Sequence, residues 1–293
     1  MENIKVINFN SSSYPRLLRE ISNPPQKLYV LGDETILNNR MISMVGSRNC
    51  TDYGRNITYD FSKKLAKEEM IIISGMAMGI DTAAHKGAIS DGGKTIAVLG
   101  GGFNDIFPKE NTELFHEIIK KGGAVITEYA KDVKAQSKHF PERNRIVSGM
   151  SIGTVVIEAG HRSGATITAR LTKMAGKKVF GVPSNIENRN NIGTHEVINR
   201  GAKLVTCVEE ILEEYGICKA LQEEFQYIPK VKLEPSIPDE YKPIYNILSK
   251  NPIHIDEISR TLNLKVSHVS FVLTMLELDG NIKQLPGKMY IRE

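Results

Sequence analysis

The sequence predicts an α/β protein with a mainly parallel sheet and helices on both faces, followed by a small C-terminal winged-helix domain. Three observations predict this class. Short apolar, often β-branched runs alternate with helical patterns, as is typical of right-handed βαβ units. Glycines recur where these runs end, at the sheet edge where open α/β folds bind ligands. After a proline-containing stretch, three helical patterns and a hairpin pattern complete the chain.

The composition is that of an ordinary globular protein. The chain of 293 residues exceeds one typical domain, and its 41% hydrophobic and 25% charged content supplies ample core material. The net charge of +4 permits a local basic patch without indicating one. Cys50, Cys207 and Cys218 lack both C-x-x-C and metal-ligand spacing, so we expect a reducing cytosol and no metal site.

Membrane and secretion signals are not expected. No apolar run approaches membrane-spanning length, and the N-terminus lacks the apolar core of a signal peptide. The sequence therefore predicts a soluble, cytoplasmic protein.

The elements follow in order. Residues 1–40 contain two proline-bearing turns that cannot be helical throughout, and we expect a lead-in that packs on a main domain spanning 41–216. Thr51 or Asp52 can cap the first helix of that domain. The expected strands are the short apolar runs Met41 to Val45, Met70 to Ile73, Thr95 to Leu99, Ala124 to Thr127, Thr154 to Ile157, Lys178 to Val182 and Ala202 to Val205.

The composition changes after residue 216. Residues 217–239 are of mixed charge with spaced prolines, which predicts a linker. Residues 240–293 form the expected winged helix. Its predicted elements are the helices Tyr241 to Leu248, Ile255 to Leu262 and Ser267 to Leu278 and a hairpin of Ile282 to Leu285 and Met289 to Arg292.

Several enzyme signatures are missing from the sequence. There is no G-x-G-x-x-G between a first strand and its helix, and no G-x-x-x-x-G-K-[ST], so neither a dinucleotide cofactor nor ATP hydrolysis at a Walker site is supported. No serine lies in G-x-S-x-G, and no cysteine is placed as an activated nucleophile. We therefore expect no cofactor and no catalytic residues.

The stretch from Phe140 to Thr172 organises the chain. A basic segment leads into a buried strand, and after Glu158 a small-residue turn, 160–164, opens into a helix. A strand, turn and helix in this order point unpaired backbone N–H groups at an anion. An aromatic, basic segment beside such a turn suggests a phosphate-bearing ligand with exposed bases.

Several motifs in order resemble the DNA-processing protein A family (DprA, also called Smf) over nearly the whole chain. The motifs are V-G-S-R (45–48), S-G-M-A-M-G-I-D-T-A-A-H (74–85), F-P-E-R-N-R-I-V-S-G-M-S (140–151), V-V-I-E-A-G-H-R-S-G-A-T-I-T-A (155–169) and G-T-H-E-V-I-N-R-G-A (193–202). Met78 departs from the family's usual arginine, Ser184 from glycine and His195 from asparagine. The first departure removes one positive charge near the expected site.

The resemblance implies a function. Members of the family bind single-stranded DNA on an extended Rossmann-like sheet, form dimers, protect incoming or recombining strands and load the recombinase RecA during natural transformation; they are not known as enzymes. It therefore implies single-stranded DNA and RecA as partners, a homodimer, and no membrane partner.

The candidate DNA-binding residues lie at strand ends or on the basic segment. They are Gly46, Ser47, Arg48, Lys109, Lys138, Phe140, Arg143, Arg145, Ser163, Gly164 and Thr166. Each has a structural alternative: an internal salt bridge for Arg48, a core position for Phe140, and a helix cap for Ser163 and Thr166. We expect Lys138 and Phe140 on a loop, with Phe140 stacking a base.

Two pairs of charged residues leave their roles open. Arg143 and Arg145 cannot share a helix face, so one is expected to meet phosphate while the other braces the sheet through Glu158 or Asp81. Asp81 and His85 are four residues apart on one helix, and without a third ligand at matching spacing we expect a hydrogen-bonded structural pair.

A second function class is a nucleotide-cleaving enzyme of the lysine-decarboxylase-like type, a nucleoside 5′-monophosphate phosphoribohydrolase. That group shares the sheet type and a Gly-rich turn beside a glutamate, here Glu158. Its P-G-G-x-G-T-x-x-E signature is missing from this sequence. Release of ribose 5-phosphate from AMP would distinguish the two classes.

Overall fold

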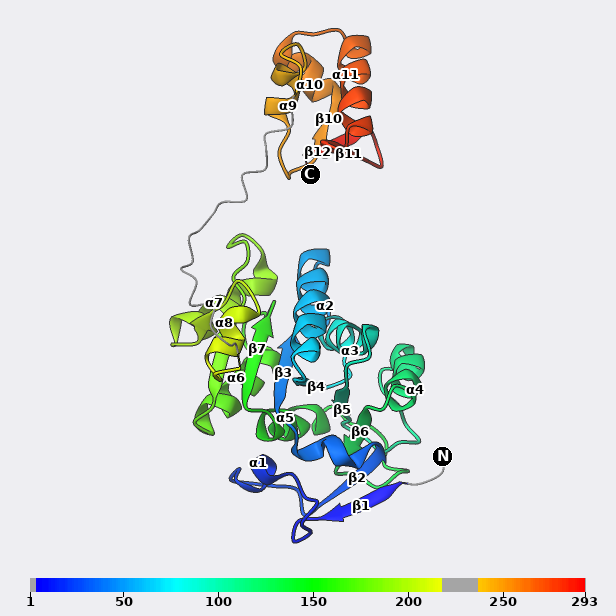
Figure 1. The fold of residues 1–293 in the computed structure, drawn as a ribbon, viewed down its shortest axis with the longest axis vertical. Coiled ribbons are helices and arrows are strands. Elements are labelled where there is room, and N and C mark those ends of the chain that lie inside the picture. Colours follow the sequence, from blue (N-terminus) through cyan, green and yellow to red (C-terminus); the bar gives the residue numbers. More distant parts are fainter. Residues whose placement is uncertain (1–3, 218–236, 293) are drawn as a thin grey trace. The chain divides into compact units, whose positions relative to one another are not determined.

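The computed structural model describes residues 4–217 and 237–292, which form two compact units, Met1–Lys219 and Ala220–Glu293 (Figure 1). Most of the linker expected at 217–239, together with Cys218, lies outside the described residues.

The first unit is built on a nine-stranded sheet among its described residues. The strands are β1 (Lys5–Asn8), β2 (Lys27–Gly32), β3 (Met41–Gly46), β4 (Ile71–Ser74), β5 (Thr95–Val98), β6 (Ala124–Thr127), β7 (Gly153–Ile157), β8 (Lys178–Gly181) and β9 (Lys203–Leu204). Their spatial order is β1-β2-β6-β5-β4-β3-β7-β8-β9. The strands from β6 to β9 in this order run parallel, which confirms the expected mainly parallel sheet.

The first forty residues contribute to the sheet itself. Strand β2 pairs antiparallel with β6, and β1 pairs antiparallel with β2. Strand β2 lies between β1 and β6, and it buries Leu28, Val30 and Leu31 while Lys27 and Gly32 stay exposed. Its proline-rich flanks concealed this pattern in the sequence.

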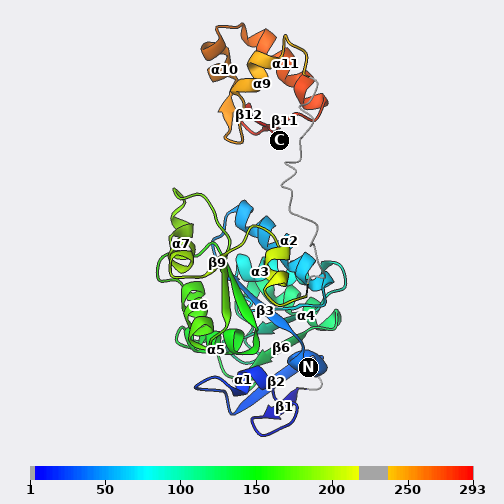
Figure 2. The same cartoon turned by 60° about the vertical axis from the view of Figure 1, so that its left-hand side comes forward.

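Helices cover both faces of the sheet, as predicted, and Figure 2 shows the two layers on opposite sides of the strands. One layer holds α2 (Asp52–Lys67), α3 (Ile80–Ser90), α4 (Thr112–Lys120) and α8 (Glu209–Glu213). The other holds α1 (Arg16–Arg19), α5 (His139–Met150), α6 (Gly164–Met174) and α7 (Ile192–Asn199). The 3₁₀ turns are η1 (Glu34–Asn38), η2 (Lys109–Asn111) and η3 (Arg189–Asn191).

The strand sequences explain this sandwich. In β3, Met41 and Val45 pack into the α5–α6 layer, whereas Ile42 and Met44 pack into the α2–α3 layer. Successive side chains of a strand point to opposite faces, so a strand covered on both faces must be apolar throughout. That is why these strands appear in the sequence as continuous apolar runs.

The second unit is a winged helix with its own core, as predicted. Its elements are α9 (Lys242–Ile247), β10 (Ile253–His254), α10 (Ile255–Leu262), α11 (Val266–Leu278), β11 (Ile282–Leu285) and β12 (Met289–Arg292). The two-residue strand β10 adds to the predicted hairpin and gives a small sheet in the order β10-β12-β11.

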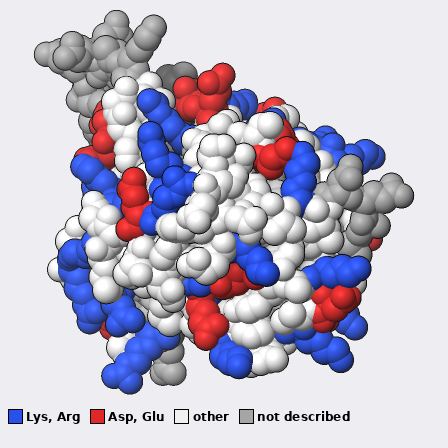
Figure 3. Space-filling model, turned by 90° about the horizontal axis from the view of Figure 1, so that it is seen from below, with Lys and Arg blue, Asp and Glu red and all other residues white. Residues whose placement is uncertain are grey.

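The described helices include none that is both long enough and apolar enough to cross a membrane. On the face shown from below in Figure 3, basic and acidic side chains are mixed around uncharged residues. The modest net positive charge is therefore not gathered into one patch on that face.

Candidate nucleic-acid interface

The order of the strands places a switch point at β3. From β3 the chain moves outward through β4, β5 and β6, and then returns to the other side of β3 as β7. Ligands of open α/β sheets bind at the carboxyl edge beside such a point. Here the edge carries the residues after β3, where Ser47 N donates to Glu158 O at 2.6 Å. Gly46 and Ser47 thus join the ends of β3 and β7.

Glu158 anchors this edge internally. Its side chain is 1% exposed, and its carboxylate accepts from Thr51 N at 2.7 Å and from the Thr51 hydroxyl. Thr51 is also the N-cap of α2, accepting from Gly54 N, as the sequence allowed. Glu158 therefore ties the start of α2 to β7, and its acceptor oxygens are engaged within the protein.

Arg143 is buried beneath the edge. It is 4% exposed, and Nη1 donates to Val98 O at 2.7 Å. Asp81, whose carboxylate accepts from Gly75 N at 3.0 Å, favours the charged guanidinium electrostatically. Burial lowers the pKa of Arg143 to about 10, against the opposing effect of Asp81, and nearby Arg48 lowers it further. These contacts favour the bracing role expected of one arginine of the pair.

Arg145 also has an internal partner. Its guanidinium forms a two-pronged ion pair with Glu128, with N–O distances of 2.9 and 2.6 Å. Glu128 follows β6, so this pair ties α5 to the end of that strand. The sequence had suggested Glu158 or Asp81 as the bracing carboxylate, and Glu128 was overlooked. Phosphate binding by Arg143 or Arg145 stays a prediction.

An exposed cation lies beside two aromatic rings at the edge. The Cζ atom of Arg48 lies 5.5 Å from the centroid of the Phe140 ring, within cation–π range. The Phe107 ring lies 5.4 Å from Phe140 at 45°, and Phe107 is 50% exposed. We call Arg48, Phe107 and Phe140 the Arg48 platform. It offers positive charge and aromatic surface to the same ligand.

Phe140 has two structural roles as well. It lies in the first turn of α5 rather than on the expected loop, because Pro141 is tolerated where the helix N–H groups lack internal partners. The ring is half-buried against Gly100, where a Cβ would lie 2.9 Å from Phe140 Cδ1. Phe107 was missed in the sequence. Its signal was an aromatic residue two positions before the candidate Lys109.

Two lysines stand at the starts of neighbouring elements. Lys109 begins η2 and Lys138 precedes α5, and both are exposed. Neither has an ion-pair partner among residues 4–217 and 237–292. Because they are exposed and have no such partner, both can contact an anion from solvent. Lys109 is two residues from Phe107 and Lys138 two from Phe140.

The turn before α6 satisfies its own polar groups. Ser163 caps the helix by accepting from Thr166 N at 3.4 Å, and the Thr166 hydroxyl donates to Ser163 O at 2.8 Å. Gly164 O accepts from Asn144 at 3.3 Å. The capping alternative is therefore realised for Ser163, and anion binding by Ser163, Gly164 and Thr166 remains a prediction.

A cavity of about 400 Å³ lies between α2 and α3 beside the platform. Arg48, Arg55 and Lys86 contribute cations to its walls. Met78, which replaces the arginine expected from the resemblance, is 42% exposed on the same wall. Even with Met78 in place of an arginine, three cationic side chains line the cavity.

Asp81 and His85 do not form the pair expected from the sequence. His85 Nδ1 lies 2.7 Å from Thr95 Oγ1, whereas Asp81 accepts from the backbone after β4. Burial lowers the pKa of His85 to about 3, and the Arg143 cation adds to this effect. Both groups therefore serve the packing of α3, through different partners.

Family models match both units of the chain. The model described as DNA recombination-mediator protein A matches residues 5–216, and that of the DprA winged helix domain matches residues 229–288. The DNA processing protein DprA of Bacillus subtilis is 37% identical over 214 residues, covering 73% of this chain and 72% of its own. The protein Smf of Escherichia coli is 36% identical over 297 residues, covering 99% and 78%.

Two solved structures share the fold of the first unit. DNA processing protein A from Streptococcus pneumoniae superposes with a TM-score of 0.69 at 37% identity, covering 73% of this chain and 75% of its own. A structure from Helicobacter pylori, which concerns the single-stranded DNA binding mode of DNA processing protein A, gives a TM-score of 0.65 at 26% identity, covering 73% and 96%.

Proposed function

We propose, for a chain that belongs to the DNA recombination-mediator protein A family, that its first unit binds single-stranded DNA at the carboxyl edge of the sheet. The observation that carries this proposal is the Arg48 platform. An exposed guanidinium beside two aromatic rings provides both elements of single-strand recognition, a cation for phosphate and flat surfaces for bases.

The platform favours single strands over duplex. In a duplex the bases stack on one another and cannot also stack on Phe107 or Phe140, whereas an unpaired base can. Lys109 and Lys138 flank the rings and can neutralise the phosphates on either side. The recognition is then tolerant of sequence, because every base has a flat face.

The edge is proposed to bind without catalysis. The alternative, nucleotide cleavage, would need a carboxylate available to the substrate, and Glu158 is buried with its oxygens bonded to Thr51. We therefore assign the chain a non-enzymatic role in protecting single strands and mediating recombination.

Three further parts of the proposal rest on family membership. They are loading of RecA, assembly as a homodimer and a cytoplasmic location. RecA loading is tested by strand exchange on DNA precoated with single-strand-binding protein, where absence of stimulation counts against it. Light scattering at micromolar concentration tests the dimer, and a strict monomer contradicts it.

The deciding experiment compares ligands at one salt concentration. Fluorescence anisotropy with labelled oligothymidylate and with a duplex of equal length should give tighter binding of the single strand. Incubation with AMP should release no ribose 5-phosphate. Equal affinity for both DNAs would contradict the platform mechanism, and release of the sugar would establish the alternative.

A further inference from the structure

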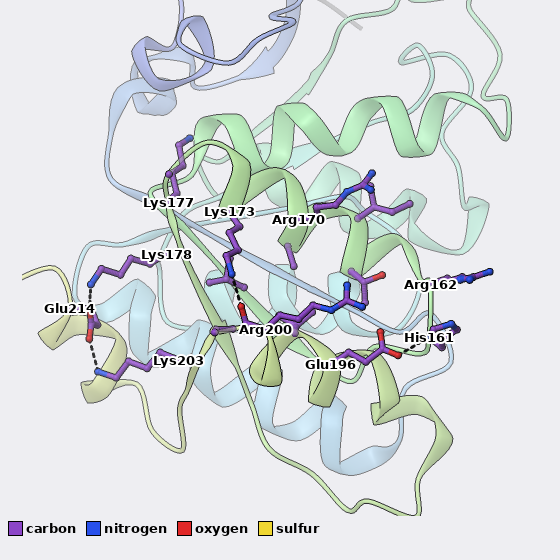
Figure 4. A pocket seen from close by; sticks show the side chains of 18 residues that line it. His161, Arg162, Arg170, Lys173, Lys177, Lys178, Glu196, Arg200, Lys203 and Glu214 are labelled. Atoms are coloured by element: carbon purple, nitrogen blue, oxygen red, sulfur yellow. Dashed lines mark hydrogen bonds and ion pairs between the residues drawn. The ribbon is translucent and has the colours of Figure 1, made fainter.

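A second cationic surface lies between α6 and α7, on the α5–α6 side of the sheet. The elements α6, β8 and α7 and the turn before β9 enclose a cavity of about 950 Å³, which we call the α6–α7 groove (Figure 4). Arg162 and Arg200 belong to two different sequence motifs, and the other cations of the groove lie between and beyond these motifs, so no single motif marked it.

The two carboxylates that line the groove, Glu196 and Glu214, both have partners inside it. Glu214 pairs with Lys178 and also with Lys203 at 2.8 Å, and these contacts lower its pKa to about 2. Glu196 lies 2.6 Å from His161. Neither carboxylate lies within ion-pair distance of an arginine of the groove.

Three guanidinium groups are left for a ligand. Arg162, Arg170 and Arg200 are exposed, and no carboxylate lies within ion-pair distance of them in the described part of the chain. Lys173 and Lys177, by contrast, donate to backbone carbonyls at the ends of α7 and α5. An arginine fork matches the geometry of a phosphate, so three unpaired forks in one groove suit a chain of phosphates.

The lining of the groove argues against stacked bases as its occupant. Among the described residues its lining includes no Phe, Tyr or Trp, so it lacks the broad aromatic surface on which unpaired bases stack. A polyanion held by its backbone charges fits best.

The groove also begins near the carboxyl edge. The turn after β7 carries Arg162 from that edge into α6, and α6 then runs back along the sheet. In Figure 4 the cations extend from His161 and Arg162 on one side to Lys177 and Lys178 on the other. The eleven residues of α6 span about 16 Å. That length accommodates several phosphates of an extended strand.

We propose that the α6–α7 groove binds the phosphodiester backbone of single-stranded DNA where the strand leaves the carboxyl edge. The identity of the polymer rests on the proposed function. The carboxyl edge would hold bases and phosphates, and the groove would hold phosphates alone.

The test compares a triple variant, Arg162→Ala, Arg170→Ala and Arg200→Ala, with the unaltered chain. The control variant Lys64→Ala, Lys120→Ala and Lys121→Ala removes the same charge from exposed positions outside the groove. Anisotropy is measured with oligothymidylates of about 6 and about 30 nucleotides, a range that brackets the site sizes of single-strand binders. Melting temperatures confirm that each variant is folded.

The groove variant should bind the short oligonucleotide as the unaltered chain does and, at 50 mM salt, the long one at least about 20-fold more weakly. Three lost phosphate contacts should reduce the log–log salt slope on the long strand by about 2, so the advantage of the unaltered chain should shrink about 20-fold between 50 and 200 mM salt. The control variant should match the unaltered chain on both.

Other outcomes overturn the inference in distinguishable ways. Unchanged binding of the long strand by the groove variant removes the groove from the DNA path while the proposed function stands. Equal losses on both lengths would place the three arginines at the edge site. Unchanged DNA binding together with lost binding of a Glu- and Leu-rich peptide would make the groove a protein-docking site. Failure of the unaltered chain to bind either oligonucleotide would overturn the proposed function itself.

Discussion

The guanidinium of Arg143 occupies the space that a side chain at Gly75 would need. A Cβ built on Gly75 would lie 1.9 Å from Arg143 Nη1, far inside van der Waals contact. The turn after β4 and the helix α5 can therefore approach only because residue 75 has no side chain. The glycine between Ser74 and Met76 is thus explained by a buried charge rather than by a ligand.

Gly75→Ala should lower the free energy of unfolding by about 2–4 kcal/mol, because the arginine must shift away from Val98 O and Asp81. Urea denaturation at neutral pH measures the change. Gly160→Ala is the matched control, since a Cβ there meets nothing within 4 Å. Equal stability of the two variants would show that Arg143 can move without cost.

Phe107→Ala should weaken single-strand binding about 5- to 150-fold, corresponding to about 1–3 kcal/mol of base stacking, without a change in melting temperature. Phe107 is the cleaner test of stacking than Phe140, whose ring also packs on Gly100. Phe271→Ala, at a position 56% exposed on the second unit, is the control. A normal affinity with a lower melting temperature would assign the ring to the core.

Arg48 and Arg145 should separate binding from stability. Arg48→Ala should reduce the salt slope by about 0.7 and leave stability within about 0.5 kcal/mol, because the side chain is exposed. Arg145→Ala should cost about 1–3 kcal/mol of stability by stranding the mostly buried Glu128 carboxylate. For the unaltered chain, the log–log salt slope of single-strand binding should be about −3 to −4 if about four to six phosphates are neutralised. A salt-insensitive affinity would contradict the electrostatic mechanism.

His85 should make the first unit sensitive to acid. Its pKa is about 3 in the folded chain against 6.5 for the free group, so between these values the unfolded chain binds a proton that the folded chain does not. The contribution of His85 to the free energy of unfolding is fully present above about pH 6.5 and falls as the pH decreases toward 3. His85→Gln should flatten this part of the stability curve, and His116→Gln, at an exposed position, should not. Identical curves for both variants would refute the assignment.

The second unit should contribute little to DNA affinity. The exposed face of α11 carries Phe271 and Leu278, 56% and 76% exposed, where a recognition helix would present polar and basic groups. On the wing, the guanidinium carbon of Arg292 lies 4.0 Å from the Tyr245 ring centroid, so this cation is engaged. A chain ending at Asp239 should keep single-strand affinity within a few-fold. A loss above about tenfold, roughly 1.4 kcal/mol, would establish a second DNA site.

The sequence predicted what depends on local pattern. Strands buried on both faces appear as apolar runs, and the caps Thr51 and Ser163 are polar residues at helix starts. The fold class followed from these signals and is confirmed. The winged helix could also be predicted from the sequence, because its helices and hairpin follow one another closely along the chain.

Pairings over long distances along the chain were not predictable. The ion pair of Arg145 with Glu128 and the contact of the Phe107 ring with the Phe140 ring depend on how strands and helices meet in space. The pairing of β2 with β6, which lies more than ninety residues later, was not predictable from local pattern either. The α6–α7 groove likewise gathers cations from separate elements. A single sequence shows which residues are charged but not which charges have partners.

The pairing of β3 with β7 has a consequence for synthesis on the ribosome. The hydroxyls of Ser43 and Thr154 form a hydrogen bond across a separation of 111 residues. Strand β3 can therefore pair with β7 only after that stretch has been translated. At about 5–20 residues per second this wait lasts about 6–22 seconds. Until then the segment carrying Arg48 has no β7 turn to fix it, because Ser47 meets Glu158 only after β7 emerges. The growing chain should therefore become competent to bind DNA late, after most of the first unit has left the ribosome.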